Sequence, residues 1–451
     1  MNLFEKILEI YQKYYLCPHC LGRMFSLLGT STTNHERGRS LLLSLTMENH
    51  RNYLSNKIDQ DNSISNLKIL AQRAYFLPAQ KILEKEGFGS FEHLSSIQCF
   101  LCHNIYDDLK KFAINAKKVI EDYEFKTFII GTSLDPKIIN KEDKFKAEFN
   151  LLESESFKNH FNREVGKILT NLLNKPPEFS NPDITIIFNL DYESYTIDLI
   201  VRSIFIYGKY NKLIRGIPQT HWDCKNCRGK GCTICNFTGK QYPSSIEELI
   251  SFEFIKESNA EGSKFHGAGR EDIDVKMLGE GRPFIIELKN PKKRTLNLNR
   301  IQKIVNKINK RKVKISELRY STKNFVKKIK FDAESTKKTY LASVTSSKKI
   351  SKEEFKEFAS NLKKKLENQK IQQKTPQRVV HRRADKVREK FIYNIDGKFI
   401  KSNLFTFIIE TQGGTYIKEL IHGDNGRTSP SFTEILGFPL TCKQLDVIKI
   451  N

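Results

Sequence analysis

The chain has 451 residues, too many for one ordinary domain, so two or three domains are expected. A formal net charge of +24 favours a polyanionic partner, most often nucleic acid, over an anionic membrane surface. No apolar run approaches the roughly 20 residues of a membrane span. The opening MNLFEKILEIYQKYY is typical of an amphipathic helix, not of a signal peptide. We therefore expect a soluble protein of the cytoplasm.

Eight of the nine cysteines form C-x-x-C pairs, and only Cys442 stands alone. In a reducing compartment such pairs indicate zinc, because two thiolates of one turn can reach one tetrahedral ion. Each of the first two pairs supplies half a zinc shell, with a redox motif as the alternative. We expect them to share one structural zinc through Cys17, Cys20, Cys99 and Cys102. The other two pairs are close together, and they could hold a second zinc through Cys224, Cys227, Cys232 and Cys235.

In chain order, residues 1–104 are predicted to be a helical zinc-binding region. Residues 105–222 alternate helix and strand: YEFKTFIIGTSL and DITIIFNLDYESYTIDLIVRSIFIYGKY have strand character, and FKNHFNREVGKILTNLLN has helical spacing. Residues 223–240 form a Cys-rich connector, and residues 241–451 are expected to be an α/β domain. The predicted fold class is therefore α+β.

Within this last domain, REDIDVKMLGEGRPFIIELK alternates apolar and charged residues around Gly279 and Gly281, which predicts a β-hairpin. Asp272 would then lie where a loop enters the first strand. Further along, KIVNKINKRKVKI and KEEFKEFASNLKKKLENQ are helix-like, and KTYLASV and LFTFIIE have strand character. The last strand is expected to lead through a Gly-Gly turn into a helix that begins near Tyr416.

The carboxylates of the expected hairpin are compatible with the metal site of a nuclease. Asp274 on one strand, with Glu287 and Lys289 on the next, matches a D…E-x-K hairpin that holds Mg²⁺ beside a scissile phosphate. The same acidic residues could instead simply pair with Lys276 or Arg282 across the hairpin.

A second chemistry needs only Asp272, because a carboxylate can act as a covalent nucleophile toward a sugar C1′. Such a carboxylate needs a nearby cation, for which the chain offers Lys418. Chemistry on a base also needs an aromatic surface for the extruded base, and Tyr340 and Tyr416 are candidates, with a buried core tyrosine as the alternative for each.

Two basic segments are expected to contact RNA phosphates, with a solvated surface as the alternative. The segment YGKYNKLIRG, near the end of the region of alternating helix and strand, contains Lys209, Lys212 and Arg215. The later segment TPQRVVHRRAD contains Arg378, Arg382 and Arg383.

Long strings of this sequence resemble the archaeal tRNA pseudouridine synthase family that acts on uridines 54 and 55 of the TΨC arm. GREDIDVKMLGEGRPFIIEL and GGTYIKELIHGDNGRTSPS resemble its catalytic domain, and TPQRVVHRRAD its basic catalytic segment. CPHCLGRMF and TTNHERGR resemble its zinc-binding start, and NPDITIIF through FIYGKYNKLIRGIPQTHWDC its THUMP-type RNA-binding module. The resemblance covers essentially the whole chain.

By position, this resemblance places the nucleophile at Asp272, preceded by Arg270. The substrate-contacting tyrosines fall on Tyr340 and Tyr416, and the basic residue of the site on Lys418. The resemblance implies a pseudouridine synthase core with a mixed sheet and flanking helices. It also implies isomerisation of uridine in tRNA, zinc in a structural role, no redox or nucleotide cofactor, and a monomer.

Two other classes of function remain as alternatives. The first is the metal-dependent nuclease, and the second is a non-catalytic tRNA-binding or chaperone module, which would bind RNA without a modified product. Thiolases and methyltransferases that carry a THUMP module are disfavoured, because we find neither a Gly-rich cofactor loop nor a pyrophosphate loop between a strand and a helix.

Overall fold

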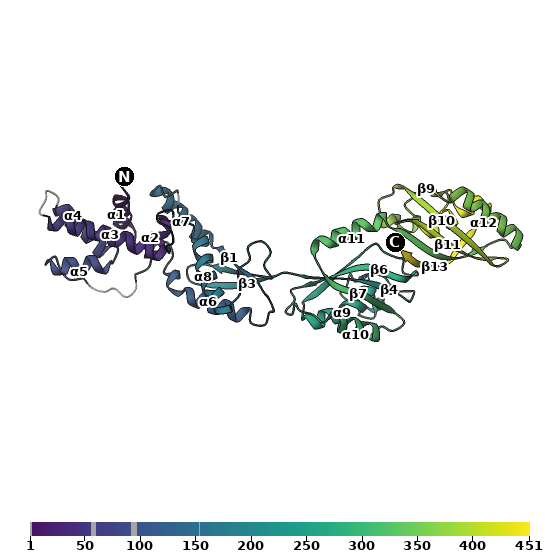
Figure 1. Cartoon of the computed structure of the whole chain (residues 1–451), viewed down its shortest axis with the longest axis horizontal. Helices are drawn as coiled ribbons and strands as arrows, with labels where there is room; N and C mark the ends of the chain where they lie inside the picture. The colour runs from purple at the N-terminus through teal and green to yellow at the C-terminus, as the bar shows by residue number, and fades with distance from the viewer. Residues whose placement is uncertain (1, 56–59, 92–96, 153) are drawn as a thin grey trace. The chain divides into compact units, whose positions relative to one another are not determined.

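The computed structural model describes residues 2–55, 60–91, 97–152 and 154–451, apart from the side chains at positions 334 and 382 (Figure 1). The chain divides into two compact units, Met1–Arg202 and Ser203–Asn451. Among the helices described, none combines the length and the apolar character needed to cross a membrane.

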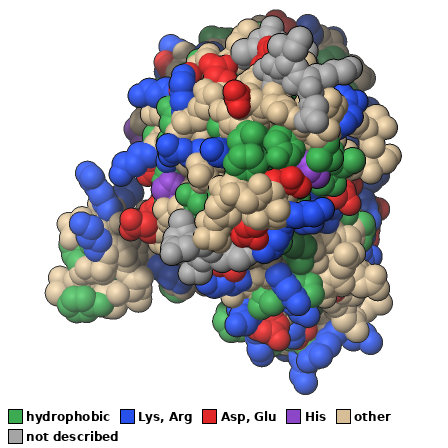
Figure 2. Space-filling model, turned by 90° about the vertical axis from the view of Figure 1, so that its left-hand side faces the viewer, with side chains coloured by type: hydrophobic (Ala, Val, Ile, Leu, Met, Phe, Trp, Pro, Cys, Tyr) green, Lys and Arg blue, Asp and Glu red, His purple; other side chains and the backbone are tan. Residues whose placement is uncertain are grey.

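The first unit begins with a helical region. Capping boxes start α1 and α3, where Asn2 pairs with Glu5 and Thr33 with Glu36. On the face drawn in Figure 2, Lys and Arg side chains are spread out and not gathered in one patch. The helices are α1 (Leu3–Lys13), α2 (Pro18–Met24), α3 (Asn34–Leu54), α4 (Gln60–Gln72) and α5 (Leu77–Lys85).

Two glycines allow α2 and α3 to pack at backbone contact. A Cβ atom built on Gly22 would lie 1.7 Å from the carbonyl oxygen of Asn34, and one on Gly38 would lie 2.0 Å from the carbonyl oxygen of Pro18. Both distances are far below van der Waals contact, so neither position can carry a side chain unless the helices separate.

The rest of the first unit is a three-stranded sheet with helices, which agrees with the helix and strand character expected for this part of the chain. Strand β2 lies between β1, to which it is parallel, and β3, to which it is antiparallel. Helix α8 packs against β1 and α6 packs against α8. The strands are β1 (Phe128–Leu134), β2 (Ile184–Leu190) and β3 (Tyr195–Val201), and the helices η1 (Ile105–Asp108), α6 (Leu109–Val119), α7 (Pro136–Glu148) and α8 (Phe157–Leu173).

A buried ion pair joins the helical region to this α/β layer. Arg23 of α2 is fully buried and pairs with Glu142 of α7. The carboxylate of Glu142 also accepts the backbone N–H of Phe157 at the start of α8, at 3.1 Å. Because an unpaired charge is costly to bury, this contact ties the two parts of the unit together.

The second unit is built on one ten-stranded mixed sheet with helices packed on it. The strand order is β12-β9-β10-β11-β8-β13-β6-β4-β7, with β5 paired to β6, and among the described strands only β13 and β6 run parallel in it. The strands are β4 (Ile204–Lys212), β5 (Gly262–Gly267), β6 (Lys276–Lys289), β7 (Val313–Ser321), β8 (Lys337–Ser346), β9 (Gln369–Lys374), β10 (Val387–Lys401), β11 (Leu404–Gln412), β12 (Thr428–Ser429) and β13 (Leu440–Ile450).

Two main hydrophobic cores lie along this sheet. One contains side chains of β4, β6, β7, α9 and α10, and the other contains side chains of β8, β10, β11, α12 and α13. The expected RNA-binding range of residues 105–222 therefore extends into the second unit, because β4 pairs with β6 and β7. The helices are α9 (Ile246–Ser258), α10 (Leu298–Ile308), α11 (Lys323–Ser335), α12 (Lys352–Leu366), α13 (Ile417–His422) and α14 (Phe432–Leu436), with η2 (Thr233–Cys235) and η3 (Gln377–Arg382).

The predicted hairpin around Gly279 and Gly281 is wrong, because β6 is one continuous strand of 14 residues. Both glycines have positive φ angles, 61° and 88°, but they bend the strand without reversing it. A Cβ on Gly279 would lie 2.1 Å from the carbonyl oxygen of Ile448 in β13. Before the bend, β6 pairs with β13 at Lys276 and Met277, and β4 pairs with Met277 and again from Arg282 onward. A turn and a bend both select glycine, so the pattern could not distinguish them.

We predict that Gly38→Ala destabilises the first unit by about 1–3 kcal/mol, because the new methyl group must push α3 away from α2. Thermal and denaturant unfolding of the full chain would measure this. Gly166→Ala in α8 is the matched control, since its Cβ would meet only Ile130 at 3.8 Å. In the control, alanine should be neutral or stabilising by up to ~1 kcal/mol. Equal stability of the two variants would contradict the role of Gly38.

Candidate active site

The loop between β5 and β6 carries Asp272, and hydrogen bonds from the end of β4 hold the backbone of this loop. The Lys212 side chain is fully buried, and its Nζ donates to the carbonyl oxygens of Asp272 at 3.1 Å and Ile273 at 2.8 Å. The backbone N–H of Gly216 also donates to the Ile273 carbonyl, at 2.9 Å. Burial lowers the pKa of Lys212 to about 8.

Glu271 anchors the same loop on the other side of Asp272. Its buried carboxylate accepts the Tyr210 hydroxyl at 2.9 Å and forms an ion pair with buried Arg282 at 2.9 Å. Gln219 donates to the Tyr210 hydroxyl at 2.8 Å and to the carbonyl oxygen of Gly269 at 3.0 Å. With Glu271 held inside the domain, the Asp272 side chain remains partly exposed.

Two cations face the Asp272 carboxylate. Arg378 contacts both oxygens, with Nη1 at 3.1 Å from Oδ1 and Nη2 at 2.9 Å from Oδ2. Lys418 Nζ lies 3.6 Å from Oδ2 and 2.7 Å from Asp274. This fork geometry fixes the direction of the carboxylate as well as offsetting its charge.

Arg378 is itself held by Glu419, a buried residue of α13. The Nε atom of Arg378 donates to Glu419 Oε1 at 2.7 Å. Partial burial lowers the pKa of Arg378, but the hydrogen bond to Glu419 and the Asp272 charge outweigh this effect, so the pKa is raised. The guanidinium is therefore charged at any physiological pH.

The two tyrosines expected to contact the substrate have different surroundings. Tyr340 on β8 is 9% exposed, and burial raises its pKa to about 12, with the Asp272 charge adding to the shift and Arg282 opposing it. Tyr340 is therefore a neutral phenol at physiological pH. Tyr416 precedes α13. Its backbone N–H donates to the Gln373 side-chain oxygen at 2.9 Å, and the Gln373 side-chain nitrogen donates to the Tyr416 carbonyl oxygen at 3.0 Å. Its hydroxyl accepts from Arg383 Nη1 at 2.7 Å.

The structure thus brings Arg378 and Lys418 from separate segments to the Asp272 carboxylate. Tyr340 lies close enough to feel the Asp272 charge, and Tyr416 is two residues before Lys418. Sequence reasoning missed the supporting residues Glu271, Gln219, Gln373 and Glu419. Glu271 and Glu419 had a local signal, because each is adjacent to a predicted site residue, Asp272 and Lys418 respectively. The others act through contacts between distant segments, which no local pattern reveals.

Several residues predicted to contact RNA have other partners. Lys212 is buried beneath the Asp272 loop, so its prediction is wrong. Arg215 donates to the carbonyl oxygens of Asp274 and Leu445 at 2.7 and 2.8 Å and pairs with Asp446.

Lys209 of the segment YGKYNKLIRG pairs with Glu317 at 2.9 Å. In the later basic segment, the Arg382 side chain lies outside the described residues. Arg270 is exposed, and its guanidinium carbon lies 5.1 Å from the centre of the Trp222 ring.

The carboxylates of the nuclease alternative do not form a common site. Asp274 binds Lys418, whereas Glu287 lies 2.9 Å from the His266 ring nitrogen. Glu287 is near the far end of β6 and follows Asp274 by 13 residues, which is roughly 40 Å along an extended chain. In the described part of the chain, the groups that could hold a metal ion are the two cysteine clusters.

Both cysteine clusters have a geometry that suits zinc. In each, four thiols lie within 4.8 Å of one another, and all nine cysteines are free. The Sγ–Sγ distance is 3.6 Å between Cys17 and Cys102. In the second cluster it is 3.9 Å between Cys224 and Cys232, 3.8 Å between Cys227 and Cys235, and 3.7 Å between Cys232 and Cys235. Four thiolates at the Zn–S distance of about 2.3 Å on a tetrahedron are about 3.8 Å apart.

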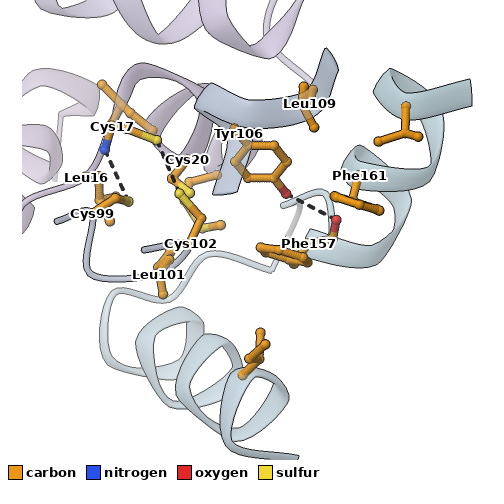
Figure 3. Close-up of a cluster of buried hydrophobic side chains, with 14 of the residues drawn as sticks. Leu16, Cys17, Cys20, Cys99, Leu101, Cys102, Tyr106, Leu109, Phe157 and Phe161 are labelled. Carbon is orange, nitrogen blue, oxygen red and sulfur yellow. Dashed lines mark hydrogen bonds between the residues drawn. The ribbon is translucent and has the colours of Figure 1, made fainter. Parts of the chain in front are cut away.

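The first cluster is buried in the core of the first unit, where its four side chains point toward one another beside Tyr106 and Phe157 (Figure 3). The Cys17 backbone N–H donates to Cys99 Sγ at 3.3 Å. The second cluster is closer to the surface and is surrounded by similar bonds, including Gly231 N–H to Cys227 Sγ at 3.1 Å. Such N–H bonds favour thiolates that bind a metal.

Comparison with known proteins gives matches along the chain. The family model described as "Pus10, C-terminal" matches residues 205–451, and "Pus10 THUMP domain, archaeal" matches residues 112–189. The tRNA pseudouridine synthase Pus10 of Methanocaldococcus jannaschii is 42% identical over 98% of this chain and 93% of its own. That of Methanopyrus kandleri is 38% identical over 99% and 98%.

A solved structure, the Cbf5-Nop10-Gar1 complex, matches 46% of this chain and 45% of its own at 17% identity and a TM-score of 0.28. The family assignment depends instead on the model that spans the second unit and on relatives aligned from end to end. On these grounds, the chain belongs to the Pus10 family.

Proposed function

We propose that the protein isomerises uridine 54, uridine 55 or both in the TΨC loop of tRNA. As a Pus10 protein, it is a tRNA pseudouridine synthase, an isomerase. The observation that supports our site assignment is the partly exposed Asp272 carboxylate, which Arg378 holds with both terminal nitrogens of its guanidinium group.

In this proposal Asp272 is the nucleophile. It acts on the ribose of an extruded uridine, the N1–C1′ bond breaks, and the uracil rotates and rejoins C1′ through C5. The C5 proton is lost and N1 gains a proton, so product and substrate have the same atoms. Because nothing is oxidised and no group is donated, the chemistry requires neither a redox nor a nucleotide cofactor.

The neighbours of Asp272 have separate tasks. Arg378 keeps the carboxylate pointed at the substrate, and Lys418 adds positive charge beside it. Tyr340 offers a neutral hydroxyl and an aromatic face, and Tyr416, held by Gln373 and Arg383, offers a second face for the uracil or a neighbouring base. Arg270, two residues before Asp272, is exposed for contact with the RNA.

We further propose that the THUMP-type module of the first unit and Arg383 contact the tRNA backbone, whereas Lys212 and Arg215 serve the site from within. We still propose four parts along the chain, with boundaries near residues 104, 222 and 240. The second part then contributes β4 to the sheet of the catalytic domain. The free thiols support a reducing, cytoplasmic location, and we propose that the protein works as a monomer.

We also propose one structural zinc ion in each cysteine cluster. The buried cluster would join the turn before α2 to the turn before η1, which are about 80 residues apart in the chain. Its sulfur spacing and the backbone bonds to sulfur support this assignment.

Asp272→Asn should fold, bind tRNA and form no pseudouridine, because the amide keeps the shape but is a far weaker nucleophile. Glu287→Gln should retain most activity, since Glu287 contacts His266 and not the site. Tritium release from C5-labelled uridine in intact tRNA, with EDTA present, measures both variants. Pseudouridine formation by Asp272→Asn, or cleavage of the tRNA that EDTA abolishes, would reject the assignment.

Arg378→Lys should lower kcat at least tenfold, because an ammonium group cannot hold the carboxylate of Asp272 and that of Glu419 in the same geometry. KM for tRNA should change less than about threefold. Lys209→Arg, on a surface ion pair, is the control. If Arg378 were only a phosphate contact, KM and the salt dependence would change while kcat stayed constant.

Purified protein should contain two zinc ions per chain by elemental analysis. Cys20→Ser should remove one and lower the unfolding temperature of the first unit, because Cys20 is fully buried. Cys235→Ser should remove the other and leave that transition unchanged. Full zinc content in either variant would contradict the ligand assignment.

A further inference from the structure

The Cys-rich knob, which we define as residues 222–241, is attached beside the catalytic loop. The Trp222 ring at its base lies 5.1 Å from the guanidinium carbon of Arg270, two residues before Asp272. Gln219, three residues before the knob, donates to the carbonyl oxygen of Gly269. The knob therefore has a fixed attachment to the segment that presents Asp272.

The knob is also closed on itself. The Cys224 N–H donates to the Gly239 carbonyl at 2.7 Å, and the Gln241 N–H donates to the Trp222 carbonyl at 2.9 Å. With four thiols clustered between these bonds, its surface side chains have a firm support.

Two large apolar side chains of the knob project into solvent. Ile234 and Phe237 are each 75% exposed. Phe237 has a φ of 58° and follows Asn236, at 49°, so a bulky aromatic residue occupies the left-handed region that it ordinarily avoids. Such strain together with exposure is a mark of a functional position.

The knob also carries three exposed cations. Lys225, Arg228 and Lys230 form no ion pair with the acidic residues that the structure describes, whereas Lys240 pairs with Glu248. Exposed aromatic and aliphatic side chains interleaved with cations are the features that bind unpaired nucleotides, since bases stack on the rings and phosphates meet the cations.

We propose that the knob binds unpaired nucleotides of the substrate tRNA next to the target uridine, with Phe237 stacked on a base and Lys225, Arg228 and Lys230 near phosphates. This inference rests on the proposed function. Extruding a uridine leaves its neighbours without a stacking partner, and an apolar surface beside the site can replace that partner.

The only tryptophan of the chain, Trp222, lies at the base of the knob, so its fluorescence reports on this surface. Unmodified tRNA transcript titrated into full-length Asp272→Asn protein should change the emission and saturate. Adding Phe237→Ala should raise the half-saturating tRNA concentration about tenfold, as expected for the loss of one stacked base. Phe237→Tyr should restore tight binding.

Replacing Lys225, Arg228 and Lys230 together by Gln should reduce the log-log salt slope of binding by about 2, at ~0.7 per phosphate contact. The same change at Lys352, Lys356 and Lys364, exposed on α12, is the charge-matched control and should alter the slope less. Equal effects of the two triple variants would overturn the proposal, because they would indicate a nonspecific charge effect.

Turnover separates this inference from the proposed function. In the active protein, Phe237→Ala should lower kcat/KM about tenfold while circular dichroism remains unchanged. If the parent protein forms pseudouridine and Phe237→Ala has the same kcat/KM, the proposed role of the knob is overturned but the proposed function is not. If the parent protein makes no pseudouridine, the proposed function fails, whatever the titrations show.

Discussion

The site depends on an ammonium group buried beneath a loop. Lys212 ends β4, the strand between β6 and β7, and donates to two successive carbonyl oxygens of the loop that carries Asp272. A loop of this length has many conformations, and ordering each residue costs about 1–2 kcal/mol. Lys212 on one side and Glu271 on the other restrict the loop, so that the Asp272 side chain faces Arg378. The fork between Asp272 and Arg378 can then form without further ordering.

Much of the fold was predictable from local sequence. The alternating and β-branched runs of β1, β2, β8 and β11 and the helical spacing of α8 and α12 gave the correct element. The helix expected over KIVNKINKRKVKI was only partly correct, because α10 ends at Ile308 and β7 begins at Val313. The hairpin prediction at β6 was wrong because the signal for a turn and for a bend between neighbouring strands is the same pair of glycines. Which one forms depends on β13, more than 150 residues later, whose backbone touches Gly279.

The same limit applies to the site. Asp272, Tyr340, Tyr416 and Lys418 were proposed from strings that resemble a known family, and the structure places Lys418 beside Asp272. Lys212 and Arg378 have the same basic character in the sequence as phosphate-binding residues. Their burial, and the carbonyls and carboxylates opposite them, come from other strands and helices. The net charge of the sequence therefore indicated a polyanionic partner, but it did not indicate which Lys and Arg side chains would contact that partner.

The position of β13 has a consequence for how the active site is assembled. This strand separates β8 from β6 and is the element through which the two halves of the ten-stranded sheet, each with its own core, become one. Asp272 belongs to one half, whereas Tyr340, Arg378 and Lys418 belong to the other. Because β13 follows all the other strands in the chain, a ribosome must synthesise both halves before they can be joined. A nascent chain that lacks β13 can thus display folded RNA-binding elements while Asp272, the nucleophile that we propose, is still separated from Arg378 and Lys418.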